Sequence, residues 1–337
     1  MKKNILSAIQ YIFFLLIGLL LLWLVFRKID IHDVAAQIKS ANYWWLLLSI
    51  GLGVLSHIAR AMRWNILIRS LGHKTDTPTT FYAVMVGYLA NMAFPRLGEV
   101  TRCGVLAKKK GIPFNGVFGT VISERVFDAA VLALIILLVI FLQMDLVSGF
   151  VNKYIVTYFS GVASRNNLFL VIFVLFVVII LPIILFKIFF NRIKHLHIYN
   201  KIRDFLKGLL DGITTIMYMK HKWSFIGLTL VIWFLYTMMT FTAFFSLEAT
   251  SGLSFTDAIT VMALGSLGMV APVPGGIGAY QFVVKAILTE IYFVASEPAV
   301  SYSIILWSAQ SAMIIVLGAI SYYILVFKKS KKSYDNT

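Results

Sequence analysis

Charge, cysteine and proline are all scarce in this sequence of 337 residues. Only 13% of its residues are charged, and it has one cysteine and seven prolines. A soluble domain carries about 25% charged and about 45–50% apolar residues, whereas this chain is 60% hydrophobic with a mean hydropathy of +0.88. One water-soluble core cannot hide such an excess, and a single cysteine excludes a disulfide scaffold. The composition predicts an all-α polytopic membrane protein, because its apolar runs have the length of spanning helices.

Catalytic and metal-binding motifs are also missing. The sequence has no Gly-x-Ser-x-Gly, no His-Glu-x-x-His, no clustered Cys/His spacing and no kinase signature. His195 and His197 lie in a basic loop without carboxylates nearby, which makes a poor metal site. We therefore expect a protein that is not an enzyme and that carries no cofactor and no metal ion.

Positive charge gathers at the ends of the apolar runs. Lys and Arg number 30 and the net charge is +16. This pattern is typical of membrane orientation and of contact with anionic lipids. We therefore expect membrane lipids with anionic headgroups as partners, and no nucleic acid.

Six apolar runs are long enough to span a membrane. We assign them to a single integral membrane domain over residues 1–337. The first run follows two lysines as in a signal peptide but lacks a cleavage site, so we expect it to remain as a helix. The six runs are Ile9–Phe26, Trp44–Met62, Asn115–Leu142, Leu168–Phe190, Trp223–Leu247 and Val300–Phe327.

Two further apolar stretches, Phe81–Phe94 and Ile259–Val270, are too short to span and end at proline and glycine. Proline removes a helix hydrogen bond and glycine permits a tight turn, and a shorter helical piece follows each break. The breaks are Pro95, Gly98, Pro272 and Pro274.

Basic residues indicate how these two stretches enter the membrane. If each enters and leaves on one side, cytoplasmic segments carry 21 Lys and Arg and external loops carry five. A simple span at either stretch would put a basic block such as Lys187–Lys222 on the wrong side. We therefore predict two re-entrant helical hairpins, and cytoplasmic N- and C-termini in a multi-pass protein of the plasma or inner membrane.

The two hairpins also read as copies. A shift of 177 residues brings Pro95 onto Pro272 and Gly98 onto Gly275. Each half, about 1–142 and 168–327, contains two spans, a broken hairpin and a further span in that order. This order predicts an inverted-topology repeat, as in many secondary transporters. The alternative is two unrelated proline kinks in a plain helical bundle. A basic amphipathic linker at 191–222 joins the halves, either as a helix on an anionic membrane face or as an orientation signal alone.

Charges inside a membrane are costly and mark candidate sites. Arg96, Glu99 and Arg102 share one face if the helix restarts after Pro95. Two arginines with one carboxylate leave a net positive site, and the planar fork of arginine suits phosphate. We expect a lipid phosphate to bind here; the alternative is a self-satisfied Arg–Glu–Arg network that holds the hairpin in place.

A second charged cluster, Glu124, Arg125 and Asp128, opens a strongly apolar helix. Its two carboxylates are four residues apart and share a face. We expect them to balance Arg96 or Arg102. Alternatively, these two carboxylates and Glu99 carry a coupling proton. A carboxylate that is buried without a partner binds a proton more readily, which favours this role.

Two more segments are candidates for phosphate contact. The N–H groups around Gly275, Gly276 and Gly278 form an anion nest at a helix start, with Lys285 two turns on. The alternative is a turn that needs glycine only for its backbone angles. The pair Arg60 and Arg63 is typical of an anchor at headgroup level, which is compatible with contact to a lipid phosphate.

These motifs resemble those of the lysylphosphatidylglycerol synthase transmembrane family. The resemblance covers essentially the whole chain and implies a flippase-like membrane protein that moves a lipid between leaflets. Larger members carry a cytosolic aminoacyl-transferase domain, whereas ten residues follow the last expected helix here, so the resemblance does not imply synthase activity. The motifs are Arg60-x-x-Arg63-Trp64, Asn91-x-x-x-Pro95-Arg96-x-Gly98-Glu99-x-x-Arg102, Glu124-Arg125-x-x-Asp128 and Pro272-x-Pro274-Gly275-Gly276-x-Gly278.

We therefore expect a translocase for an anionic phospholipid or a polyprenyl-phosphate-linked lipid. Two alternatives stay open. One is a secondary transporter of a small anion, and the other is a non-catalytic membrane partner that presents lipid to a separate lipid-modifying enzyme.

Overall fold

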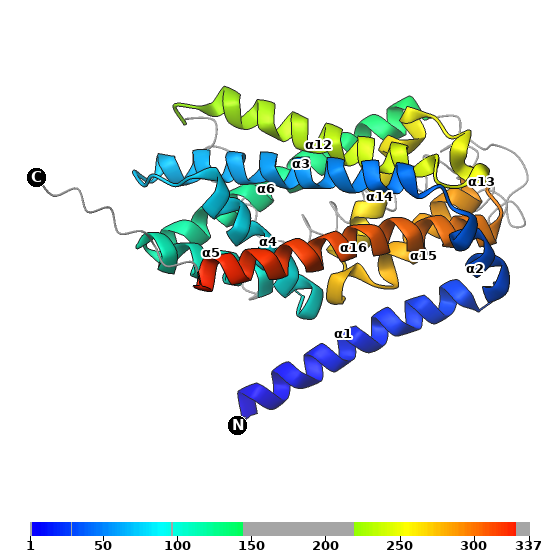
Figure 1. The fold of residues 1–337 in the computed structure, drawn as a ribbon, viewed down its shortest axis with the longest axis horizontal. Coiled ribbons are helices and arrows are strands. Elements are labelled where there is room, and N and C mark those ends of the chain that lie inside the picture. The colour runs from blue at the N-terminus through cyan, green and yellow to red at the C-terminus, as the bar shows by residue number, and fades with distance from the viewer. Residues whose placement is uncertain (1, 28, 96, 144–218, 328–337) are drawn as a thin grey trace, which may run out of the picture.

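The computed structural model describes residues 2–27, 29–95, 97–143 and 219–327, and the regular elements in these ranges are helices (Figure 1). The expected span Leu168–Phe190 and most of the expected linker at 191–222 lie outside the described residues. The elements are α1 (Lys2–Phe26), α2 (Ile31–Ser40), α3 (Tyr43–Ser70), α4 (Thr77–Ala93), α5 (Leu97–Lys110), α6 (Phe114–Leu142), α12 (Lys222–Phe244), α13 (Glu248–Ser251), α14 (Phe255–Val270), the 3₁₀ turn η3 (Pro274–Gly276), α15 (Ala279–Glu290) and α16 (Ser296–Phe327).

Four of the described helices, α3, α6, α12 and α16, are long and apolar enough to cross a membrane. A fifth candidate is α1 joined to α2 through a bend of 90°. The four helices lie roughly along the long axis of the molecule, and α1 diverges from them toward its N-terminal end (Figure 1). The prediction of an all-helical, multi-pass membrane protein is confirmed, and the short helix α2 is an element that the sequence analysis missed.

Helix α3 continues about two turns beyond the apolar run that predicted it. Hydropathy placed the end of this span at Met62, but the helix ends at Ser70 and buries Arg60 and Arg63 inside the protein. Carboxylates on α6 compensate these charges, so the helix does not end where the basic residues begin.

The helices α4 and α5 form a hairpin that is broken near Pro95. Gly98 lies so close to α4 that a Cβ atom there would overlap the carbonyl oxygen of Gly87. The Gly98 N–H also donates to Asn91 Oδ1 at 2.7 Å. Glycine at position 98 therefore lets the two helices approach backbone to backbone.

The open end of this hairpin is tied by Asp76, which caps the start of α4, and Lys110, the last residue of α5. The two side chains form an ion pair. Burial alone would raise the pKa of Asp76, but hydrogen bonds from Lys110 and Thr79 hold it at about 2. The start of α4 and the end of α5 thus lie at the same end of the hairpin.

The helices α14 and α15 form a second hairpin, joined through η3. A Cβ atom on Gly268 of α14 would lie 2.8 Å from the carbonyl oxygen of Ala279. Three glycines of the connection have positive φ angles, 57° at Gly275, 71° at Gly276 and 78° at Gly278. Only glycine adopts these angles readily, so the turn requires glycine for its backbone shape.

Gln143, the residue after α6, ties the open end of the second hairpin. Its amide donates to Asp257 Oδ1 in the first turn of α14 at 3.1 Å. Its carbonyl oxygen accepts from the hydroxyl of Tyr292, two residues after α15, at 2.9 Å. The start of α14 and the end of α15 are therefore held at the C-terminal end of α6.

The two hairpins have their open ends at opposite ends of α6. This helix starts at Phe114, close in sequence to the end of α5, and its 29 residues extend over about 43 Å at 1.5 Å per residue. The two breaks, in contrast, lie next to each other. A Cβ atom on Gly275 would lie 3.0 Å from the side chain of Met92, and Trp307 of α16 donates to the Gly275 carbonyl at 2.8 Å.

Candidate functional site

Five charged side chains form a buried cluster between three helices. The helix α3 supplies Arg60 and Arg63, α5 supplies Arg102, and α6 supplies Glu124 and Asp128. Residues three or four apart lie on one helix face, so each pair points to the same side of its helix. None of the five is more than 9% exposed. Because α3 and α6 are candidate spans, we treat this cluster as the charged site within the membrane.

Glu124 lies at the centre of the cluster. Its Oε1 atom accepts from Arg60 Nη1 at 2.7 Å and from Arg63 Nη2 at 3.1 Å, and its Oε2 atom accepts from Arg102 Nη2 at 3.2 Å. Asp128 bonds Arg60 at 3.0 Å and Arg63 at 2.6 Å. Such charge-assisted, forked hydrogen bonds are the strongest in proteins. They hold α3, α5 and α6 together through two carboxylates.

Uncharged side chains complete the surroundings of the arginines. From α12, the Tyr236 hydroxyl accepts from Arg60 and the Thr229 hydroxyl accepts from Arg63, each at 3.0 Å. The guanidinium of Arg102 lies 4.8 Å from the ring centre of Trp64, a cation–π contact. The sequence analysis quoted Trp64 in a motif but missed Tyr236 and Thr229 as site residues. A hydroxyl in an apolar span was the available signal, because such groups seek partners inside the bundle.

A further ion pair extends the cluster toward its exposed side. Arg125 Nη2 lies 3.1 Å from Glu99 Oε1, with side chains 39% and 24% exposed. Among the described residues, four arginines of the extended cluster face three carboxylates. The Nε atoms of all four arginines are buried without a hydrogen-bond partner in the described structure. The extended cluster therefore carries one positive charge in excess and retains spare donors.

A small cavity lies beside this extended cluster. It holds about 10 Å³ and is lined by Arg102 and Arg125 together with Tyr88 and Asn91. A space of about this size admits one water molecule. Two guanidinium groups from different helices thus line one space next to the break of the first hairpin.

The predicted arginine site is only partly described. Arg96 lies outside the described residues, so its role stays a prediction. Arg102 pairs with Glu124, and Glu99 pairs with Arg125. Glu99 and Arg102 of α5 therefore do not pair with each other. Among the described residues, their ion-pair partners are Arg125 and Glu124 of α6.

In the glycine turn, several of the N–H groups that were expected to bind an anion form hydrogen bonds within the protein. The N–H groups of Gly276, Ile277 and Gly278 donate to Val273 O, Pro274 O and Gln281 Oε1 within the turn. These bonds leave fewer donors for an anion, whose binding there stays a prediction.

Lys285, which the sequence analysis set beside the glycine turn as a further phosphate contact, contacts α1 instead. Its Nζ atom donates to the carbonyl oxygen of Val25 in α1 at 2.9 Å. The lysine thus ties α15 to α1. Arg60 and Arg63 likewise differ from the expected headgroup anchor, because both are buried among carboxylates rather than exposed at a helix end.

The comparison with protein families agrees with the motifs. Residues 11–318 match the family described as Lysylphosphatidylglycerol synthase TM region. The chain belongs to this family. The match includes every described residue of the cluster and both hairpins, so the site lies within the family's membrane region.

Two curated relatives resemble parts of the chain. UPF0104 membrane protein MJ1595 of Methanocaldococcus jannaschii is 28% identical over 142 residues, which cover 41% of this chain and 40% of that protein. Glycosyltransferase AglD of Haloferax volcanii is 28% identical over 120 residues, which cover 35% of this chain and 19% of that protein. The matched parts thus span less than half of either relative. No solved structure matches the chain.

Proposed function

We propose that this membrane protein moves an anionic phospholipid or a polyprenyl-phosphate-linked lipid between leaflets. The observation that carries the proposal is the charge excess of the extended cluster, where four arginines face three carboxylates among the described residues. An uncompensated charge within spanning helices is costly and marks a functional site. A lipid phosphate supplies the missing negative charge and accepts forked hydrogen bonds from arginine. The proposal involves binding and movement, with no covalent chemistry.

The phosphate site of this proposal is the small cavity between Arg102 and Arg125. Among the described residues, Arg102 forms fewer hydrogen bonds than the buried Arg60 and Arg63. It donates one hydrogen bond, of 3.2 Å, to Glu124. The cavity admits about one water molecule, so a phosphate enters only if α5 moves away from α6. Glu99, Glu124 and Asp128 then keep the remaining arginines neutralised; the coupling-proton role stays a prediction. Arg96 and the turn at Pro272–Gly278 are further candidates for the headgroup.

The arrangement of the hairpins supports the proposal. Their open ends lie at opposite ends of α6 and their breaks meet at Met92 and Gly275. We propose that both are re-entrant, that they belong to an inverted repeat, and that the N- and C-termini are cytoplasmic. Sites in many secondary transporters form where broken helices meet near the midplane.

Cysteine labelling tests this arrangement, because Cys103 is the chain's single cysteine and is buried. In a Cys103→Ser background, Lys74→Cys marks the exposed loop before α4, and Ser251→Cys marks the exposed segment before α14. We expect a membrane-impermeant maleimide on intact cells to label position 251, and position 74 only after permeabilisation. Labelling of both positions from the same side contradicts the inverted arrangement.

Reconstitution tests the function itself. Purified protein in vesicles is supplied with labelled phosphatidylglycerol or polyprenyl phosphate, and leaflet exchange is timed. Arg102→Gln and the more exposed Arg125→Gln each remove one charge-assisted hydrogen bond, worth about 1.5–3 kcal/mol. We therefore expect exchange to slow by about tenfold or more. Lys108→Gln, an exposed change in the same helix, is the matched control. Equal exchange by wild type and both arginine variants, with each lipid, counts against the proposal.

A second candidate function is supported by the relative from Haloferax volcanii. This relative is named as a glycosyltransferase, and only 19% of its length matches this chain. We propose as the alternative that this chain presents a lipid to a separate transferase. Co-purification with such an enzyme, together with the absence of leaflet exchange by the protein alone, favours this alternative.

A further inference from the structure

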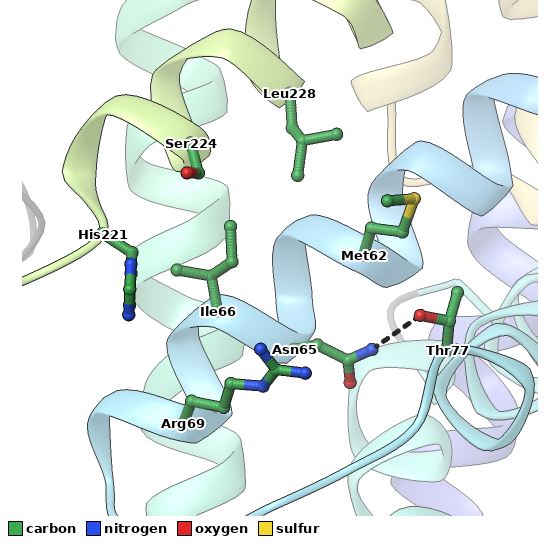
Figure 2. A pocket seen from close by; sticks show the side chains of 8 residues that line it. All are labelled: Met62, Asn65, Ile66, Arg69, Thr77, His221, Ser224 and Leu228. Carbon is green, nitrogen blue, oxygen red and sulfur yellow. Dashed lines mark hydrogen bonds between the residues drawn. The ribbon is translucent and has the colours of Figure 1, made fainter.

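A second polar cavity lies between the end of α3 and the start of α12, on another face of these helices than the arginine cluster (Figure 2). Its volume is about 260 Å³. Arg60 and Arg63 of α3 point into the cluster, whereas Met62, Ile66 and Arg69 line the cavity. The motifs of the sequence analysis did not include any of the residues that line it.

Part of the lining of this cavity is polar and basic. Arg69, His221 and Ser224 belong to it, and all three residues are exposed (Figure 2). Among the described residues, the guanidinium of Arg69 forms no ion pair. His221 occupies the N-cap position of α12, but its side chain does not cap the helix. A free guanidinium thus lies beside a helix start whose N–H groups favour an anion.

The floor of the cavity is held in place by a network around Asn65. Its amide donates to Thr77 Oγ1 at 3.3 Å, as drawn in Figure 2. Its carbonyl oxygen accepts from the hydroxyls of Thr75 and Thr80. A buried polar group with all its partners in place is oriented before a ligand arrives. The floor of the cavity, at Asn65 and Thr77, is therefore preorganised.

Another part of the lining is apolar. Met62, Ile66 and Leu228 form it (Figure 2), and Met62 is 44% exposed. A cation and several apolar side chains in one lining match an amphipathic ligand better than a free ion. Pockets for drug-sized ligands measure about 300–1,000 Å³, so this cavity accommodates a headgroup while longer chains stay outside.

The surrounding residues place the cavity at a membrane surface. It lies at the shared end of α3 and α12, both candidate spans. Trp223, in the first turn of α12, is 76% exposed, with Lys220 and Lys222 beside it in the sequence. Exposed tryptophan and flanking lysine are typical of the headgroup layer. Phosphates of the surrounding lipids lie at this same depth.

We propose that this cavity binds the phosphate of an anionic phospholipid headgroup. Arg69 and His221 contact the phosphate, and the acyl chains leave past Met62 and Leu228 into the membrane. The inference concerns binding alone and is independent of lipid movement between leaflets.

The test is a titration of the full-length protein in an uncharged detergent. Short-chain phosphatidylglycerol is added, and binding is followed by the rise in the thermal unfolding midpoint, which bound ligand produces by mass action. We expect Arg69→Gln to weaken the apparent affinity by about tenfold, as expected for a lost charge-assisted hydrogen bond. Lys74→Gln removes an exposed charge at the same end of the molecule and is the matched control, with affinity unchanged.

Three further arms identify the ligand. Short-chain phosphatidylcholine tests net charge, and inorganic phosphate and glycerol 3-phosphate test a free anion. We expect all three to bind more weakly than phosphatidylglycerol. The proposal is overturned if Arg69→Gln binds phosphatidylglycerol like wild type, if phosphatidylcholine binds equally well, or if either free anion binds as tightly with the same dependence on Arg69. The unliganded midpoint of Arg69→Gln reports folding, and Ser224→Ala provides a second, smaller change in the same wall.

Discussion

Glu124→Gln is expected to lower the free energy of unfolding by about 3–5 kcal/mol, the usual cost of removing one partner from a buried ion pair. Glu124 is fully buried and bonds three arginines from two helices. The neutral amide keeps the shape of the side chain but leaves Arg102 without its carboxylate. Unfolding in detergent, followed by circular dichroism, measures the loss.

Glu99→Gln is the matched control for this prediction. It also removes a carboxylate from an arginine pair, but Arg125 and Glu99 are partly exposed. Water screens such pairs, which contribute about 0–1 kcal/mol. Similar losses in both variants would show that the cluster is not held together by Glu124.

Gly98→Ala is expected to destabilise the first hairpin by about 3 kcal/mol or more, at the upper end of overpacking effects. The new Cβ atom would overlap the carbonyl oxygen of Gly87 and lie 2.6 Å from Asn91 Cγ. A backbone atom cannot rotate away as a flexible side chain does, so α4 and α5 must separate. The unfolding midpoint and the yield of monodisperse protein report this change.

Gly104→Ala in the same helix is the control, because in the described part of the chain no atom beyond this helix's own backbone lies within 4 Å of the Cβ position there. Alanine is a better helix former than glycine by about 1 kcal/mol, so this variant is expected to equal or exceed wild type in stability. If both alanine variants behave alike, the close approach at Gly98 is not a structural requirement.

The cluster and the hairpins depend on each other. Arg102 lies on α5, the second arm of the first hairpin, and its ion pair with Glu124 fixes that arm to α6. The far end of α6 holds the second hairpin through Gln143. A shift of α5 that opens the small cavity therefore acts on the helix against which both hairpins are anchored.

The spans and the breaks were accessible from the sequence. Long apolar runs such as Asn115–Leu142 cannot remain in water, so they predict spanning helices, and α6 has nearly the same bounds. Proline at 95 and 272 interrupts helices for local steric reasons. The true end of α3 was missed because hydropathy reads a buried, compensated arginine as the end of a span. Helix α2 was missed because its ten residues form no long apolar run.

The sequence did not predict which side chains pair with one another in the charged cluster. Glu99 and Arg102 share a face of α5, which favoured a local network, yet each pairs with a different residue of α6. Tyr236 and Thr229 come from a helix more than a hundred residues away in the chain. Contacts over such separations depend on how helices pack, which spacing along one helix does not report.

By itself the sequence determined a helical membrane protein, the four spans that α3, α6, α12 and α16 confirm, and the residue types that carry charge within them. The reason is that the cost of exposing apolar groups to water and the backbone limits of proline and glycine are local properties. Only the tertiary structure decided that Arg60 and Arg63 are buried and that Glu124 bonds three arginines. It also decided that Lys285 bonds a carbonyl of α1 and that Arg69 lines a cavity. These outcomes depend on which helices pack together, since a buried charge is stable only where another helix brings its counter-charge within hydrogen-bond distance.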